Sequence, residues 1–286
     1  MPTSPSVVIT GTSSGIGWGA SKVLLQRGFR VFGSVRKQSD ADRLSREFGP
    51  NFTPLLMDVT DAASIHAAAS KVAKGIGPNR LAGLVNNAGI AVTGPLLHIS
   101  ADELRRQMDV NVTSILQVTQ AFAPLLGTDP NRIGAPGRIL NISSVGGKLG
   151  VPFIGAYIAS KHAVEGLSLS LRQELLLYGI DVIVIGPGAV VTSIWDKAEQ
   201  DDYTRFAATP YGPSIAKFAK LFIEDGRKGL TPEQLGQAIH TALTARNPKP
   251  RYAVVPQPLK NWILPRLLPT RSLARLIGKQ VGLLPS

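Results

Sequence analysis

The 286-residue sequence contains no cysteine, so neither a disulfide framework nor thiol chemistry is available to it. It also lacks any run of about 18 uninterrupted apolar residues, the length that a transmembrane helix requires. Residues 1–11 show neither the basic start nor the apolar stretch of a secretory signal peptide. These absences lead us to expect a cytoplasmic protein.

Acidic residues are missing from the last part of the chain. No Asp or Glu follows Glu233, in a sequence with 31 basic and 19 acidic residues and a formal net charge of +12. A high isoelectric point is typical of nucleic-acid binders, but no recognised nucleic-acid motif accompanies the charge, so we expect no nucleic-acid partner. The cations that follow Glu233 carry two thirds of the excess: Arg246, Lys249, Arg251, Lys260, Arg266, Arg271, Arg275 and Lys279.

Short apolar runs alternate with helical patterns, and hydrophobic residues make up 44% of the chain, enough for a core. The runs are continuous rather than alternating, which is typical of strands buried on both faces. Strands separated by helices predict an α/β fold with a doubly wound parallel sheet of the Rossmann type, about seven strands and a C-terminal helical extension. The predicted strands are residues 6–10, 29–35, 53–58, 82–86, 137–143, 181–187 and 251–255.

Helix starts and domain limits are less strongly marked. A helix is expected near residues 17–27, and Thr231, Pro232 and Gln234 predict another helix start with a capping box. No linker divides the chain, so we expect one catalytic domain over residues 1–258. The tail at 259–286 follows, and Pro265 and Pro269 are expected to break its first part.

A glycine-rich turn follows the first predicted strand and precedes a helix. Glycine is needed where the backbone turns sharply and where it approaches a pyrophosphate closely. The helix N-terminus then offers free N–H groups to the anion. No GxxxxGK[ST] pattern occurs, which argues against a P-loop hydrolase. The residues of the turn are Gly11, Thr12, Ser13, Ser14, Gly15, Ile16 and Gly17.

Tyr157 and Lys161 are four residues apart and share one face of a helix. A free tyrosine has a pKa of about 10 and is a poor base near neutrality. A nearby ammonium stabilises the phenolate and lowers that pKa, which makes the pair a plausible acid/base couple. Taken alone, this spacing is also common on amphipathic helices.

Further segments lie where predicted strands end, the edge at which doubly wound sheets bind ligands. With them the sequence resembles the short-chain dehydrogenase/reductase family over about residues 5 to 195. The matching pieces are TGTSSGIG at 10–17, NNAG at 86–89, Asn111, NISS at 141–144, YIASK at 157–161 and PG at 187–188.

The resemblance implies a role for each catalytic residue. Tyr157 would donate a proton to a carbonyl oxygen, Lys161 would lower its pKa and bind the nicotinamide ribose, and Ser144 would hold the substrate oxygen. Asn111 would anchor a water in a proton relay. Ser143 is the rival of Ser144, but the 13-residue spacing to the tyrosine favours Ser144. The nicotinamide supplies the hydride, so no metal is expected.

The same resemblance implies a nicotinamide cofactor. NAD-specific relatives carry an acidic residue where Val35 stands here, and Arg36 and Lys37 follow it. A cation favours binding of a 2′-phosphate, so Arg36 predicts NADP(H). The alternative is that Arg36 and Lys37 are both solvated surface cations. Together with the glycine-rich turn, Tyr157 and Lys161, the expected cofactor contacts are Arg36, Asp58, Val59, Asn87, Ala88, Gly89, Pro187, Gly188, Val190 and Thr192.

The segment at about 193–226 corresponds to the substrate lid of the family. Six aromatic residues between Trp195 and Phe222 favour a hydrophobic alcohol or its ketone or aldehyde as substrate, although ordinary helix packing would also explain them. In the tail, Arg271, Arg275 and Lys279 form a basic stripe, and an apolar stripe of Leu273, Leu276, Ile277 and Val281 lies on the other side. Such a helix either lies peripherally on an anionic membrane or packs on the domain or a partner subunit.

Two other functions stay open at this point. One is a 3-oxoacyl thioester reductase acting on an acidic carrier protein, and the other is a non-catalytic NADPH-binding sensor on the same fold. The presence of all four catalytic-type residues disfavours the sensor. The basic tail and the stretch at 28–37 show a weaker resemblance to the branch of 17β-hydroxysteroid and retinol dehydrogenases. A homodimer or homotetramer is expected from the family.

Overall fold

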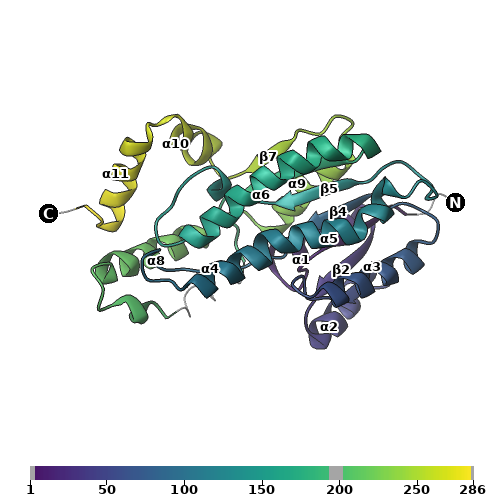
Figure 1. The fold of residues 1–286 in the computed structure, drawn as a ribbon, viewed down its shortest axis with the longest axis horizontal. Coiled ribbons are helices and arrows are strands. Elements are labelled where there is room, and N and C mark those ends of the chain that lie inside the picture. The colour runs from purple at the N-terminus through teal and green to yellow at the C-terminus, as the bar shows by residue number, and fades with distance from the viewer. Residues whose placement is uncertain (1–3, 193–201, 285–286) are drawn as a thin grey trace.

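The computed structural model describes residues 4–192 and 202–284. Seven strands form one sheet in the order β3-β2-β1-β4-β5-β6-β7, and every neighbouring pair is parallel. This confirms the predicted doubly wound sheet. Strands β2, β4, β5 and β7 of this sheet are labelled in Figure 1, with helices around them. The strands are β1 (Ser6–Ile9), β2 (Arg30–Val35), β3 (Phe52–Leu56), β4 (Gly83–Asn86), β5 (Arg138–Ile142), β6 (Asp181–Pro187) and β7 (Arg251–Val254).

Helices cover both faces of the sheet. One apolar core lies between the sheet and α1, α2 and α9, and a second lies between the sheet and α3, α5 and α6. The α-helices are α1 (Gly15–Gln26), α2 (Gln38–Phe48), α3 (Ala62–Ile76), α4 (Ala101–Met108), α5 (Ser114–Ala123), α6 (Gly155–Glu174), α8 (Gly212–Gly226), α9 (Pro232–Thr244), α10 (Leu264–Leu267) and α11 (Thr270–Val281). The short 3-10 and π turns are η1 (Asp109–Thr113), η2 (Pro124–Thr128), η3 (Val145–Gly147), η4 (Leu175–Tyr178), η5 (Tyr203–Phe206) and η6 (Leu259–Ile263).

Each predicted strand lies within two residues of an observed one, because the continuous apolar runs are buried on both faces, as in β1 and β4. The predicted capping box at the start of α9 is also present, with Thr231 and Gln234 bonding each other's backbone N–H groups. Helix α1 begins at Gly15, two residues earlier than expected, since Ser14 is its N-cap. Helical structure therefore starts inside the glycine-rich turn.

The C-terminal tail packs on the domain at two places. Val281 is buried in an apolar cluster with residues of α8, and the Gly282 carbonyl accepts a hydrogen bond of 2.8 Å from Ser214 Oγ. Trp262 of η6 lies against the guanidinium of Arg251. Pro265 does not break the tail, contrary to expectation, because it occupies the first turn of α10, where a proline is tolerated. Leu276 faces solvent instead of joining the packed stripe.

Candidate active site

The glycine-rich turn lies at the carboxyl edge of the sheet, between β1 and α1. Gly11 and Gly15 have φ angles of 71° and 60°, a region that favours glycine. A Cβ on Gly17 would collide with the Gly11 carbonyl oxygen and stand 2.6 Å from Asn87 Nδ2. Gly17 therefore permits the tight turn that brings the N-terminus of α1, with its positive dipole end, to this edge. Ser13, Ser14 and Ile16 complete the turn.

The loop after β4 holds this turn in place. Asn87 Nδ2 donates to the Thr10 and Gly11 carbonyls at 2.8 and 2.9 Å. Thr10 Oγ1 accepts from the N–H groups of Asn87 and Ala88, both at 2.9 Å. The Thr12 hydroxyl is directed at the Ser34 carbonyl, 3.1 Å away. The structure thus brings the NNAG segment beside the glycine-rich turn, and Gly89 continues toward Asn111.

The ends of β2 and β3 bring Arg36 and Asp58 near each other. Arg36 is exposed, and hydrogen bonds from Thr60, assisted by the charge of Arg36, lower the pKa of Asp58. Val59 is buried beside Asp58. A second cation that the sequence did not reveal is Arg43 of α2, whose Nη2 donates to the Ser13 carbonyl at 2.6 Å.

The segment after β6 closes the same edge from the other side. Pro187 ends β6, and the Gly188 N–H donates to the Val254 carbonyl at 3.0 Å. Val190 is buried and pairs with Leu230. Thr192 Cγ2 would lie 3.2 Å from a Cβ on Gly15, so this segment returns to the glycine-rich turn.

Tyr157 and Ser144 lie together where β5 meets α6. Ser144 caps η3, its Oγ accepting from the Gly146 N–H at 3.0 Å, and its side chain also hydrogen-bonds the Tyr157 phenol. Burial raises the pKa of Tyr157, and the Ser144 hydrogen bond opposes that rise. The lowering by Lys161 stays a prediction. Ser143, the rival serine, turns toward the Lys161 carbonyl at 3.5 Å instead.

Lys161 is an internal ammonium one helical turn beyond Tyr157. It is 6% exposed, and its Nζ donates to the Ile142 carbonyl at 2.8 Å and lies 5.6 Å from the centre of the Tyr157 ring. Burial lowers the pKa of Lys161 to about 8, while the negative charge of Glu165 acts in the opposite direction. The side chain is therefore poised to exchange its proton near neutral pH.

Asn111 lies in η1, a π-helical turn between α4 and α5. Its Oδ1 accepts from the Ile90 N–H at 2.9 Å, and its Nδ2 donates to the Ile90 carbonyl and to Ser160 Oγ, both at 3.0 Å. Single π turns inside helices often occur at functional sites. The predicted water relay through Asn111 stays a prediction.

Aromatic side chains from the segment predicted to form the lid lie close to Tyr157. Tyr157 packs against an apolar cluster that contains Phe153, Phe206 and Phe218. The Phe153 ring lies 5.4 Å from that of Phe218, and its φ of 64° places it in a strained region for a residue with a side chain. Trp195, also expected in the lid, falls outside the described residues.

The short chain dehydrogenase family model matches residues 5–203. This chain belongs to the short-chain dehydrogenase family. It is 37% identical to the NADPH-dependent 3-dehydrocapnine reductase of Ornithobacterium rhinotracheale, over 96% of both chains. It is 32% identical to the 3-ketodihydrosphingosine reductase of Bacteroides thetaiotaomicron, over 87% of both. A crystal structure of a short-chain dehydrogenase from Streptomyces avermitilis matches with a TM-score of 0.76 and 25% identity, covering 99% of this chain and 98% of that one.

As a short-chain dehydrogenase the protein is an oxidoreductase, which confirms that expectation. The sequence pointed to most of the residues gathered at the carboxyl edge, but it missed three charged ones that touch them: Arg43, Glu165 and Arg251. Glu165 could have been found, because it follows Lys161 at helical spacing. Arg251 was counted only among the cations that follow Glu233 and as the start of the last predicted strand, yet its guanidinium pairs with Glu165.

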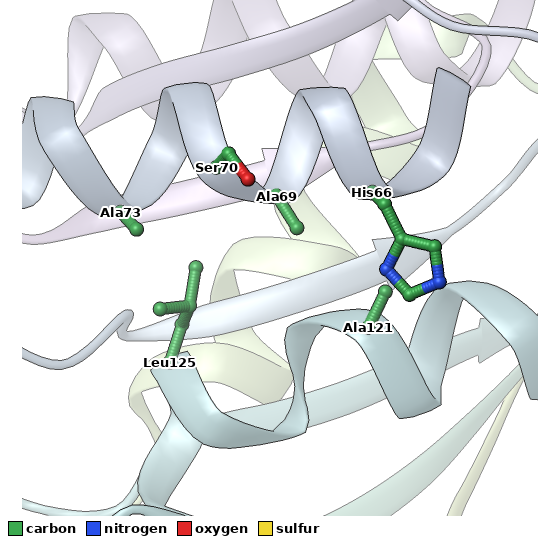
Figure 2. A pocket seen from close by; sticks show the side chains of 6 residues that line it. All are labelled: His66, Ala69, Ser70, Ala73, Ala121 and Leu125. Atoms are coloured by element: carbon green, nitrogen blue, oxygen red, sulfur yellow. The ribbon is translucent and has the colours of Figure 1, made fainter. Parts of the chain in front are cut away.

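A separate hollow of about 240 Å³ lies between α3 and α5 (Figure 2). None of the residues at the carboxyl edge lines it, so it does not belong to the candidate site. Among the described residues, no group of three or more His, Asp or Glu side chains is placed to hold a metal ion. The lining residues of the hollow are His66, Ala69, Ser70, Ala73, Ala121 and Leu125.

Proposed function

We propose that this short-chain dehydrogenase reduces a hydrophobic ketone or aldehyde to its alcohol with NADPH, and that Tyr157 is the proton donor. The observation that carries the proposal is the meeting of three groups where β5 joins α6. Ser144 bonds the phenol of Tyr157, and the ammonium of Lys161 lies one helical turn away. The side chain of Tyr157 also packs against an apolar cluster.

Each side chain has a distinct task in this mechanism. The Ser144 hydroxyl would hold the substrate oxygen beside the phenol, which aligns the carbonyl for protonation. Tyr157 would release its proton to that oxygen as negative charge develops there. The Lys161 ammonium would stabilise the phenolate left behind. When bound, the reduced nicotinamide supplies the hydride.

The residues at the carboxyl edge fit a dinucleotide. Side chains at Gly11 or Gly17 would fill the turn, since added Cβ atoms would meet Ala88 and the Gly11 carbonyl. The turn ends in the N-terminus of α1, which favours a pyrophosphate. Arg36 at the end of β2 would bind the 2′-phosphate, and Arg43, held against the Ser13 carbonyl, would add a second cation nearby. The relative from Ornithobacterium, named as NADPH-dependent, supports the same preference.

An apolar substrate is favoured by the surroundings of Tyr157. Tyr157 packs against a cluster that contains Phe153, Phe206 and Phe218, and such apolar surroundings suit the hydrocarbon part of a ligand better than a charged group. Both relatives named above are reductases, one of a 3-dehydro compound and one of a 3-keto derivative of dihydrosphingosine. We therefore place a ketone on a long apolar chain first among the substrates to test.

The test is NADPH consumption with a panel of ketones that differ in chain length, in wild type and in Tyr157→Phe. Tyr157→Phe removes only the proton donor, so turnover is expected to vanish while NADPH binding persists. Binding is measured separately by the fluorescence of bound NADPH. Turnover close to wild type in Tyr157→Phe would overturn the assignment, and activity confined to acyl thioesters of an acidic carrier protein would replace the substrate class.

We further propose that the tail contacts an anionic membrane surface from which such a substrate is drawn. Leucine side chains of η6 and α10 remain exposed although other parts of the tail are packed, and Leu267 is 73% exposed. Cations are interspersed with them, and no acid follows Glu233. Each cation near an anionic surface adds roughly 1 kcal/mol of attraction. Among the described residues, no helix is long and apolar enough to span a bilayer.

Vesicle binding tests the membrane contact. The wild type is expected to sediment with phosphatidylglycerol vesicles at low salt and to be released at high salt, because the attraction is screened. Leu267→Ser should weaken the binding, whereas Ile133→Ser, which removes an equally apolar exposed side chain from the loop before β5, should not. A wild-type protein that ignores these vesicles at low salt would contradict the membrane contact.

We also propose a homodimer or homotetramer. The supporting observation is a set of exposed leucines on α5, α6 and η4, because exposed apolar side chains often mark a protein–protein interface. They are Leu116, Leu169, Leu176 and Leu177. Sedimentation analysis should give a mass above that of one chain, and Leu176→Lys should lower it. A monomeric wild type at micromolar concentration would end this proposal.

A further inference from the structure

A buried ion pair links the catalytic helix to the opposite end of the sequence. Arg251 of β7 directs its Nε at both carboxylate oxygens of Glu165, at 3.0 and 3.1 Å. Glu165 follows Lys161 by one helical turn on α6, and its side chain is 6% exposed, whereas that of Arg251 is 17% exposed. Burying two charges is costly unless their geometry and hydrogen bonds are good. Because burial of this ion pair costs free energy, packing alone does not explain it, and a functional role is worth considering.

The same guanidinium also touches the catalytic serine segment. Arg251 Nη2 donates to the main-chain carbonyl of Ser144 at 3.1 Å. One planar group therefore bonds a side chain of α6 and the backbone at the end of β5. A guanidinium can do this because its donors point in fixed directions, which a lysine ammonium cannot reproduce.

Two glycines make the room that this arrangement needs. A Cβ on Gly186 of β6 would collide with Arg251 Nη2 and stand 2.7 Å from its Cζ. A Cβ on Gly147 of η3 would stand 2.9 Å from the Glu165 side chain. The backbone on both sides of the ion pair is bare, so the guanidinium and the carboxylate lie directly against it.

The tail completes the arrangement from outside. The Trp262 ring lies against two guanidiniums, with the Cζ of Arg251 at 4.3 Å and that of Arg266 at 4.4 Å from its centre. An aromatic face attracts a cation and excludes water from it. Trp262 thus shields part of the Arg251 guanidinium from water.

We propose that Arg251 is a positioning residue of the catalytic centre. Its hydrogen bonds to the main-chain carbonyl of Ser144 and to the carboxylate of Glu165 fix Ser144 relative to the helix that carries Lys161. Trp262 supports this arrangement by covering the guanidinium of Arg251. The inference rests on the proposed function, because Ser144 and Lys161 matter for turnover only if the reduction runs through them. Glu165, on the helix that carries Lys161, is hydrogen-bonded by Arg251 of β7 and paired with Lys148 after η3, whose Nζ lies 3.6 Å from Glu165 Oε2. The titratable phenol of Tyr157 precedes Lys161 by one turn, and its ring centre lies 5.6 Å from Lys161 Nζ. The negative charge of Glu165 raises the pKa of Lys161.

The test compares Arg251→Met, Glu165→Gln and Arg251→Lys with a control, Arg246→Met. This control removes an exposed cation that lies five residues before the start of β7. We expect Arg251→Met to lower kcat/KM roughly tenfold to a hundredfold, because small displacements of catalytic groups cause losses of that order. Arg251→Lys should recover part of the loss, and Arg246→Met should match the wild type.

The pKa of Lys161 can be measured by NMR of its isotope-labelled side-chain nitrogen, without any substrate. This measurement distinguishes a positioning role of Arg251 from a general loss of structure in the variants. Glu165→Gln should lower the pKa of Lys161, whereas Arg251→Met, which leaves Glu165 without its closest cation, should raise it. Shifts in these opposite directions support the proposal. Equal pKa values in all variants, or full activity in folded Arg251→Met, would overturn it. Absent turnover in the wild type would instead refute the proposed function.

The part played by Trp262 is tested in the same assays. Trp262→Ala should lower kcat/KM in the direction of Arg251→Met, and Trp262→Phe, which keeps an aromatic face, should restore most of it. Gln280→Ala, at an exposed position of α11 in the same tail, is the matched control. Activity in Trp262→Ala equal to that of the control would show that the tail does not support Arg251.

Discussion

The cost of keeping Lys161 charged inside the protein leads to a prediction about stability. The pKa of Lys161 falls from 10.5 to about 8 on burial. At about 1.4 kcal/mol for each tenfold change in proton affinity, the buried ammonium destabilises the fold by about 3 kcal/mol at neutral pH. Between pH 8 and 10.5 the unfolded chain holds this proton and the folded chain does not, so stability rises with pH. The penalty is complete below pH 8 and absent above pH 10.5.

Lys161→Met removes the charge and keeps much of the side-chain volume. It also leaves the Ile142 carbonyl without its donor, at a cost of about 1–3 kcal/mol that does not depend on pH. We therefore expect an inactive variant about as stable as the wild type at pH 7.5. As the pH rises to 10.5, the wild type should gain about 3 kcal/mol over the variant.

Urea unfolding followed by circular dichroism, at several values between pH 7.5 and 10.5, measures this difference. Other titrating groups are common to both proteins and cancel when the two free energies of unfolding are subtracted. Two parallel curves over this range would refute the reasoning, because they would mean that Lys161 titrates alike in the folded and unfolded chains.

Two further predictions concern the cofactor edge. Arg36→Ala should raise the Michaelis constant for NADPH roughly tenfold and leave that for NADH nearly unchanged, since only NADPH carries the 2′-phosphate; equal effects on both cofactors in steady-state assays would show that Arg36 does not read the phosphate. Gly17→Ala should lower the free energy of unfolding by about 1–3 kcal/mol and abolish NADPH binding, because its Cβ would collide with the Gly11 carbonyl. The control is Gly166→Ala in α6, which has open space around it and should stabilise the protein slightly. If Gly17→Ala bound NADPH as well as this control does, the close approach of the Gly17 backbone to the Gly11 carbonyl would not matter for cofactor binding.

Local patterns were sufficient to predict the sheet and the glycine-rich turn. Continuous apolar runs identify strands because a parallel sheet buries both faces, and this holds for β1, β2, β4, β5 and β6. The edge strands β3 and β7 are only partly buried. The capping box at Thr231 was equally readable, since its hydrogen bonds join residues three apart. Tyr157 and Lys161 were visible for the same reason, as neighbours on one helix.

Contacts between distant segments could not be predicted in this way. Arg251 and Glu165 are 86 positions apart, and nothing near Arg251 distinguishes it from the other cations of the C-terminal part. The π-helical turn that carries Asn111 also has no local sequence signature. Its Asn111 side chain is held by hydrogen bonds to Ile90 and Ser160, which lie far from it in the sequence. Pro265 was wrongly predicted to break a helix. It lies in the first turn of α10, where the backbone N–H that proline lacks would have no partner within that helix.

The bare backbone around Arg251 has a consequence for how relatives of this chain diverge. Any side chain at Gly186 would occupy the space of the guanidinium, and any at Gly147 would press on the Glu165 carboxylate. Substitution of one of these four positions therefore changes what the other three tolerate. In descendants of a common ancestor, an arginine at 251 is expected to be inherited together with the acid at 165 and both glycines, and a lineage that loses the arginine is free to acquire larger residues at 147 and 186.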